Sequence, residues 1–158
     1  MKSASLADIK KELSHLSQPR LIEICLRIAR FKKVNKELAN YLLFEAHDEG
    51  AYIEKVKTII SERYIEMPVN NLFFTTKYLR KTLRITKQYI QYSGNKQTEI
   101  ELMLYYCRLL KDAPLQIKKY NPLFNLYERL LEKIAKDLSK LHEDLQYDYT
   151  KELEKLRL

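Results

Sequence analysis

Apolar residues recur along this chain at the three- and four-residue spacing of amphipathic helices. The pattern is clear in residues 17–33, where one face is formed by Leu21, Ile24, Cys25, Ile28 and Phe31. Successive residues of a helix lie about 100° apart, so this spacing gathers apolar side chains on one side. A half-buried strand would instead alternate apolar and polar residues one by one. The pattern therefore predicts helices along most of the chain.

Capping residues and helix breakers set the ends of the predicted helices. Ser5 with Asp8 three residues later resembles a capping box. Gly94 suits the left-handed end of a helix, and Asn95 suits the start of the next one. The helices that we expect cover residues 5–13, 17–33, 35–48, 50–67, 71–93, 96–111 and 122–157. We therefore predict an all-α fold of six or seven helices, arranged as an irregular helical bundle or an α-α superhelix.

The last predicted helix, residues 122–157, is long and carries a heptad seam. Its apolar positions alternate in steps of three and four from Phe124 to Leu145, which is the spacing of a helix that packs against one partner helix. The narrow part of the seam, Leu138, Leu141 and Leu145, is the candidate association surface. Its partner is either a neighbouring helix of the same chain or a second copy in a homodimer.

The composition agrees with a single helical domain over residues 1–158. Glycine occurs only twice and no Asn-Gly or Asp-Gly pair is present, which disfavours tight β-hairpins. The chain has twelve tyrosines and no tryptophan; a tyrosine suits the edge of a helical core because its ring packs while its hydroxyl reaches water. Cys25 and Cys107 both lie in apolar runs, so we expect buried, reduced thiols rather than a disulfide or a catalytic cysteine.

Positive charge is concentrated in one acid-free stretch. The chain has a net charge of +8, and neither Asp nor Glu occurs between Met67 and Thr98. On a helix, five cations of this stretch fall within an arc of about 120°, and the apolar residues lie on another face. We call these cations the basic stripe: Lys77, Arg80, Lys81, Arg84 and Lys87. Such a stripe attracts a polyanion, a membrane surface or an acidic protein; an ordinary solvated helix face is the alternative.

A second basic cluster precedes the stripe, and the apolar face opposite the stripe is also predicted. The second cluster is formed by Arg27, Arg30, Lys32, Lys33 and Lys36, with no acid between its ends. The residues expected to be buried behind the stripe are Leu72, Leu79, Leu83 and Ile90. Phe73 is the exception, since it falls among the charges of the stripe.

Signatures of an enzyme or a metal centre are missing from the sequence. It contains no Gly-rich phosphate loop, no Gly-x-Ser-x-Gly elbow and no Cys-x-x-Cys pair. His47 lies among Glu45, Asp48 and Glu49, but adjacent helical residues point about 100° apart and do not converge. We expect an acidic helix end there and a solvated surface around His142. We therefore expect no catalytic residue, cofactor or metal.

The N-terminal residues lack the apolar core of a signal peptide. No stretch approaches the roughly 18 uncharged apolar residues of a membrane span. We therefore expect a cytoplasmic protein with no transmembrane segment.

Residues 16–33, followed by residues 35–49, resemble conserved all-helical bacterial proteins to which no function is assigned. The resemblance would extend over most of the chain and implies an all-helical fold. The matching residues carry no known chemistry, so the resemblance implies no functional residue.

Two functions fit these patterns. The sequence favours a non-enzymatic helical module for protein interaction or scaffolding. The alternative is a nucleic-acid-binding protein that uses the basic helix at residues 71–93, with the basic stripe as the polyanion-binding residues. The two differ in their dependence on salt, because binding to phosphates releases counterions.

Overall fold

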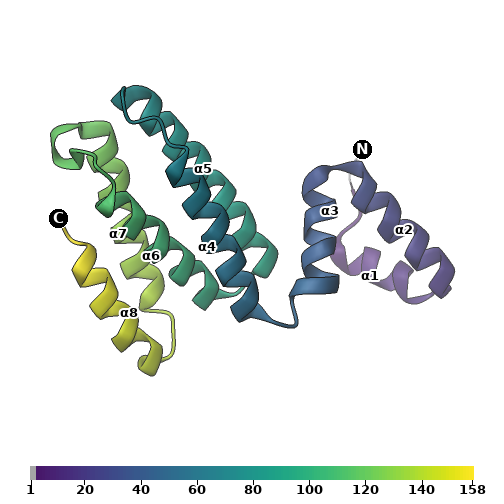
Figure 1. Cartoon of the computed structure of the whole chain (residues 1–158). Helices are drawn as coiled ribbons and strands as arrows, with labels where there is room; N and C mark the ends of the chain where they lie inside the picture. The colour runs from purple at the N-terminus through teal and green to yellow at the C-terminus, as the bar shows by residue number, and fades with distance from the viewer. Residues whose placement is uncertain (1–2) are drawn as a thin grey trace. The chain divides into compact units, whose positions relative to one another are not determined.

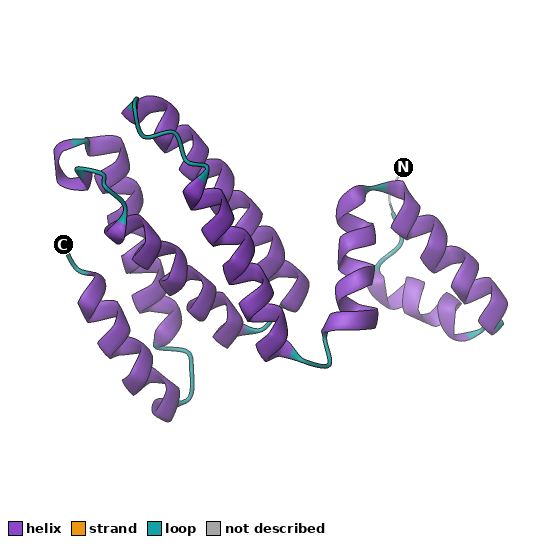
Figure 2. Cartoon of the chain, in the orientation of Figure 1, coloured by secondary structure: helices purple, strands orange, loops and turns teal. Residues whose placement is uncertain are grey.

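The computed structural model describes residues 3–158, and over that range the chain is helical without any strand (Figure 1, Figure 2). The described range contains eight α-helices, whereas six or seven were predicted. They are α1 (Leu6–Ser14), α2 (Gln18–Phe31), α3 (Lys33–Asn40), α4 (Glu49–Ile65), α5 (Leu72–Ser93), α6 (Lys96–Asp112), α7 (Asn121–Leu138) and α8 (Glu143–Leu156). A π-helical turn, η1 (Tyr41–Glu45), follows α3, and a 3-10 turn, η2 (Ile117–Lys119), precedes α7. The all-α prediction is confirmed.

The sequence predicts one domain over residues 1–158, and the chain divides into two compact units that meet between Phe44 and Glu45. In the N-terminal unit, the predicted capping box is present at the start of α1. The Ser5 hydroxyl accepts a hydrogen bond from the Asp8 amide, and the Asp8 carboxylate accepts one from the Ser5 amide, each at 3.2 Å. Asn35 does not start a helix as predicted. It lies inside α3, and its side-chain amide donates to the Ile28 carbonyl at 2.9 Å.

Little apolar surface is buried in the N-terminal unit. Among its described residues only Tyr41 is buried. Cys25 is exposed, so the prediction of a buried thiol at this position is wrong. The physical reason is that α2 is apolar over roughly 220° of its circumference, and the packing of α2 against α3 covers only part of that surface.

Helix α6 lies at the centre of the C-terminal unit. It packs against α4, α5, α7 and α8, so it is buried on several sides, and eight of its residues are buried: Thr98, Ile100, Leu102, Met103, Leu104, Tyr106, Cys107 and Leu110. Burial raises the pKa of the Cys107 thiol to about 12, which keeps it protonated and unreactive. The prediction of a buried, reduced Cys107 is confirmed.

Helices α5 and α6 are joined by Gly94 and Asn95, which act as the sequence predicts. Gly94 ends α5 in the left-handed region at φ 65°, and its amide donates to the Ile90 carbonyl at 2.9 Å. Asn95 then caps α6 by accepting a hydrogen bond from the Gln97 amide at 2.8 Å. The two helices pack against each other. A two-residue connection of this kind reverses the chain because glycine adopts positive φ without a steric penalty.

The prediction of one helix over residues 122–157 is wrong. Helix α7 ends at Leu138 with Ser139 as its C-cap, and α8 starts at Glu143. Figure 1 shows the chain reversing there, and α8 packs back on α7 and α6. The reversal buries Leu153 and Leu156 inside the chain. The turn contains neither Gly nor Pro, and the heptad spacing of apolar residues continues through it. The sequence therefore gives no sign of the turn.

Ion pairs and hydrogen bonds join α4 to α6 and α6 to α8, and several of them connect residues with the same separation in sequence. Lys57 bonds Glu101 at 2.7 Å across α4 and α6, and the two residues are 44 positions apart. Arg108 bonds Glu152 at 2.8 Å across α6 and α8, again 44 positions apart. Lys111 donates to the Lys155 carbonyl at the same separation. Because the Arg108 and Lys111 contacts share one offset, α6 and α8 run in the same direction.

Candidate polyanion interface on α5

Helix α5 has a buried inner side and an exposed outer side. Asn71 caps the helix, and its side-chain oxygen accepts hydrogen bonds from the amides of Phe73 and Phe74. The inner side packs against α4 and α6. It buries Leu79, Leu83 and Ile90 as predicted, whereas Leu72 is only half-buried.

The inner side also buries four threonines that the sequence reasoning missed: Thr75, Thr76, Thr82 and Thr86. The Thr76 and Thr86 hydroxyls donate to the carbonyl four residues earlier, and the single hydroxyl proton of Thr75 lies between two carbonyl acceptors, Asn71 and Pro68, so the hydroxyls are satisfied inside the core. Thr82 accepts a hydrogen bond from the Arg63 guanidinium at 3.2 Å. Their positions on the apolar side of the helix were the signal that could have identified them.

The outer side of α5 carries the basic stripe. All five cations are exposed, as the helical period predicts. Within the part of the chain that the structure describes, none of the five has an ion-pair or hydrogen-bond partner. The predicted orientation is confirmed, and the charges of the stripe are left for water or for a ligand.

Several cations elsewhere in the C-terminal unit are paired with acids. Lys57 bonds Glu54 and Glu101, each at 2.7 Å. Asp137 is held by Lys140 at 2.7 Å and by Lys133 at 2.9 Å. The hydrogen bond from Lys140, followed by the one from Lys133, lowers the pKa of Asp137 to about 2, although partial burial opposes this. Of these four pairs, Lys57–Glu101 joins two helices and the other three are local to α4 or to the end of α7. None of them involves the basic stripe.

Aromatic and aliphatic side chains lie exposed at the start of α5. Phe73 falls among the charges of the stripe as predicted and is not covered, and Phe74 beside it is also exposed. The two rings meet edge to face, with centroids 5.6 Å apart. Ile65 at the end of α4 and Val69 in the connection are exposed as well. Sequence reasoning found Phe73 but missed the cluster, because helical periodicity does not describe a connection between helices.

The second basic cluster lies on α2 and α3 in the N-terminal unit. Its five residues, Arg27, Arg30, Lys32, Lys33 and Lys36, are all exposed. Lys33 forms an ion pair with Glu37 at 3.5 Å, and the Lys32 ammonium lies 5.8 Å from the Phe31 ring centroid. This cluster is therefore partly engaged within its own unit.

The candidate association residues do not form one helix face. Leu138 is buried at the end of α7, Leu141 lies in the turn, and Leu145 lies on α8. Leu141 and Leu145 are half-buried within the chain. A single seam for a partner helix therefore does not exist at these three positions.

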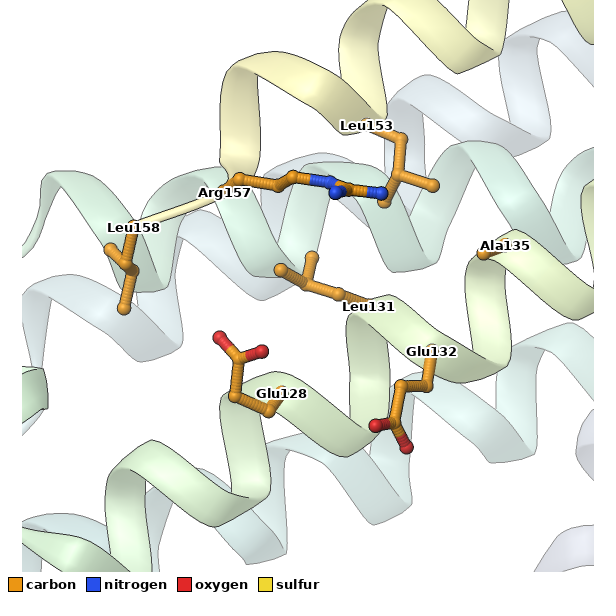
Figure 3. Close-up of a pocket in the computed structure, with 7 residues that line it drawn as sticks. All are labelled: Glu128, Leu131, Glu132, Ala135, Leu153, Arg157 and Leu158. Atoms are coloured by element: carbon orange, nitrogen blue, oxygen red, sulfur yellow. The ribbon is translucent and has the colours of Figure 1, made fainter.

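A half-open hollow of about 390 Å³ lies between α7 and α8. Figure 3 shows Leu131 of α7 and Leu153 of α8 at this hollow, with the Arg157 side chain extending toward Leu153. Glu128, Glu132, Ala135 and Leu158 complete its lining. Its titratable groups do not converge on one point in Figure 3, so it does not have the arrangement of a catalytic centre.

The remaining candidate chemistry does not assemble into a site. His47 is exposed, and its neighbour Asp48 caps α4 by accepting a hydrogen bond from the Ala51 amide at 2.9 Å. His142 is exposed and lies 3.4 Å from the Asp144 carboxylate. Across residues 3–158, no three His, Cys, Asp or Glu side chains are grouped to hold a metal ion. Over the same residues, no helix combines the length and the apolar character needed to cross a membrane.

Comparisons with protein-family models, with curated proteins and with solved structures find no significant match to this chain. The function is therefore inferred from the surface of the chain itself.

Proposed function

We propose that this protein is a non-enzymatic helical interaction and scaffold module whose binding surface is the basic stripe of α5. The observation that carries the proposal is the contrast in ion pairing. Lys57 of α4, Lys96 of α6 and Lys133 of α7 bond acids within the C-terminal unit, whereas all five cations of the stripe, gathered on one helix face, have no such partner in the described chain. Unpaired positive charge gathered on one helix face attracts an anionic partner.

The arrangement of the helices supports the scaffold part of the proposal. One contact between α4 and α6 and one between α6 and α8 each join residues that are 44 positions apart. An α-α superhelix produces such a repeated separation, because each helical hairpin stacks on the previous one in the same way. In such a fold α4, α6 and α8 form one layer. Helix α5 belongs to the other layer, which leaves its outer side available for binding.

Nucleic acid is the second candidate partner of the basic stripe. It is favoured by the complete lack of acid between Met67 and Thr98, because an acid in that stretch would repel phosphates. Each phosphate neutralised on a duplex should reduce affinity by about 0.9 log units per log unit of salt. An apolar protein interface should be far less sensitive to salt.

The test is affinity capture from lysate with and without nuclease. We expect an anionic macromolecule to be captured by the full chain and lost with a stripe variant that carries Arg80→Gln, Lys81→Gln and Arg84→Gln. The matched control carries Arg129→Gln, Lys136→Gln and Lys155→Gln, which removes the same charge from exposed cations of α7 and α8. Equal capture by both variants would refute the proposal, and loss of the captured partner on nuclease treatment would favour nucleic acid.

A further inference from the structure

We infer that the basic stripe and the apolar cluster beside it form one docking site for an anionic phospholipid surface. This inference rests on the proposed function, since it names the partner of the same face. It starts from an observation that charge alone does not explain. Four apolar side chains are exposed around the start of α5: Ile65 at 85%, Val69 at 49%, Phe73 at 63% and Phe74 at 56%.

The apolar cluster is held in place by the connection between α4 and α5. Asn71 caps α5 through its hydrogen bonds to the amides of Phe73 and Phe74. The Thr75 hydroxyl donates to the Pro68 carbonyl at 2.5 Å, and Met67 is buried beneath the connection. The exposed side chains are therefore presented by an ordered connection, and their exposure does not come from fraying.

The cations continue directly from the apolar cluster. With Leu72 set to zero, Phe73 lies at about 100° around the helix, inside the arc of roughly 60–180° that contains the stripe. Lys77 follows one turn after Phe73, and the stripe then extends for about 15 Å to Lys87. No acid lies on α5. Glu66, at the end of α4, accepts a hydrogen bond from the Tyr78 hydroxyl at 3.3 Å.

A lipid surface explains both halves of this site. Apolar side chains enter the boundary between headgroups and acyl chains, and cations beside them bind anionic headgroups. A fluid bilayer needs no matching pocket. Nucleic acid would use the cations and could stack on the phenyl rings, but it gives no reason for Ile65 and Val69 to be exposed.

The experiment is co-sedimentation of the full chain with vesicles of phosphatidylcholine alone, or with about one third phosphatidylserine. We expect binding to the anionic vesicles only. The stripe variant (Arg80→Gln, Lys81→Gln, Arg84→Gln) should partition on the order of a hundredfold less, because each cation near the surface contributes about fivefold. Phe73→Ala with Phe74→Ala should also reduce partitioning, by about tenfold for each ring that enters the bilayer.

Two controls separate these effects from unfolding or general charge loss. The α7–α8 variant (Arg129→Gln, Lys136→Gln, Lys155→Gln) and Tyr147→Ala, which removes an exposed aromatic ring elsewhere, should bind like the original chain. Circular dichroism should show the same helicity for every variant.

Three outcomes would overturn the inference. They are no binding to anionic vesicles, binding that the double phenylalanine variant leaves unchanged, and equal loss with the control variants. In a parallel arm with a DNA duplex, stripe-dependent binding to DNA without vesicle binding would refute the lipid inference and leave the proposed function standing. If the stripe variant changes neither these arms nor the lysate capture, the proposed function fails too.

Discussion

Tyrosine hydroxyls fix the register between helices of the C-terminal unit. Tyr106 donates to the Leu79 carbonyl at 2.9 Å, Tyr127 to the Leu156 carbonyl at 2.6 Å, and Tyr64 to the Tyr106 carbonyl at 3.0 Å. Burial, as the largest cause, raises the pKa of Tyr106 and Tyr127 above the ordinary value of 10.0. From the sequence, tyrosine hydroxyls at the edge of a helical core are expected to reach water. They instead satisfy carbonyls on neighbouring helices, which a residue count does not reveal.

We predict that Tyr127→Phe destabilises the protein by about 1–3 kcal/mol, because the Leu156 carbonyl loses its buried donor while the ring stays packed. The measurement is chemical denaturation followed by circular dichroism. Tyr147→Phe is the matched control, since Tyr147 is 65% exposed and surface changes usually stay within about 0.5 kcal/mol. If the two variants lose equal stability, the hydrogen bond of Tyr127 does not stabilise the contact between α7 and α8.

At the scale of helices, the sequence predicted those elements whose ends carry a distinctive residue. Gly94 and Asn95 act as expected, and the basic stripe is exposed because the helical period alone determines its side. The break after Leu138 was missed, since tertiary packing of α8 on α6 and α7 decides it. The exposed apolar cluster around Phe74 was missed for a related reason. Whether a side chain in the connection between two helices is exposed depends on which residues lie near it in space, and helical periodicity does not describe that.

The two glycines provide a matched test of helix ends. Gly94→Ala should cost about 1–2 kcal/mol, because a Cβ at φ 65° is strained, although no atom lies within 4 Å of the added carbon. Gly50→Ala, in the first turn of α4, should stabilise the protein by about 0.4–1 kcal/mol, because alanine lowers the conformational entropy of the unfolded chain. The added Cβ fits, since it would make an ordinary contact of 3.5 Å with Asp48 Oδ1. Denaturation midpoints of the two variants should move in opposite directions. A Gly94→Ala variant as stable as the original chain would contradict the left-handed conformation of Gly94.

At the scale of the whole molecule, the buried core lies almost entirely in the C-terminal unit, whereas most of the exposed large apolar side chains of the described chain lie in the N-terminal unit. All buried hydrophobic residues of the described chain except Tyr41 lie in residues 45–158. The described N-terminal unit exposes Leu6, Ile22, Phe31, Leu43 and other large apolar side chains. Its helices have 9, 14 and 8 residues. Isolated helices shorter than about 12–15 residues are marginal in water.

We therefore predict that a fragment of residues 45–158 folds cooperatively, whereas a fragment of residues 1–44 does not. The first keeps α6 with all four of its helical neighbours, and the second lacks the apolar burial that would offset the conformational entropy lost on folding. Circular dichroism during thermal unfolding should show a sigmoidal transition for 45–158 and a shallow, featureless change for 1–44. The full chain is the reference, and its main transition should lie close to that of the larger fragment. A cooperative transition in the isolated residues 1–44 would show that α1, α2 and α3 stabilise one another without a buried core.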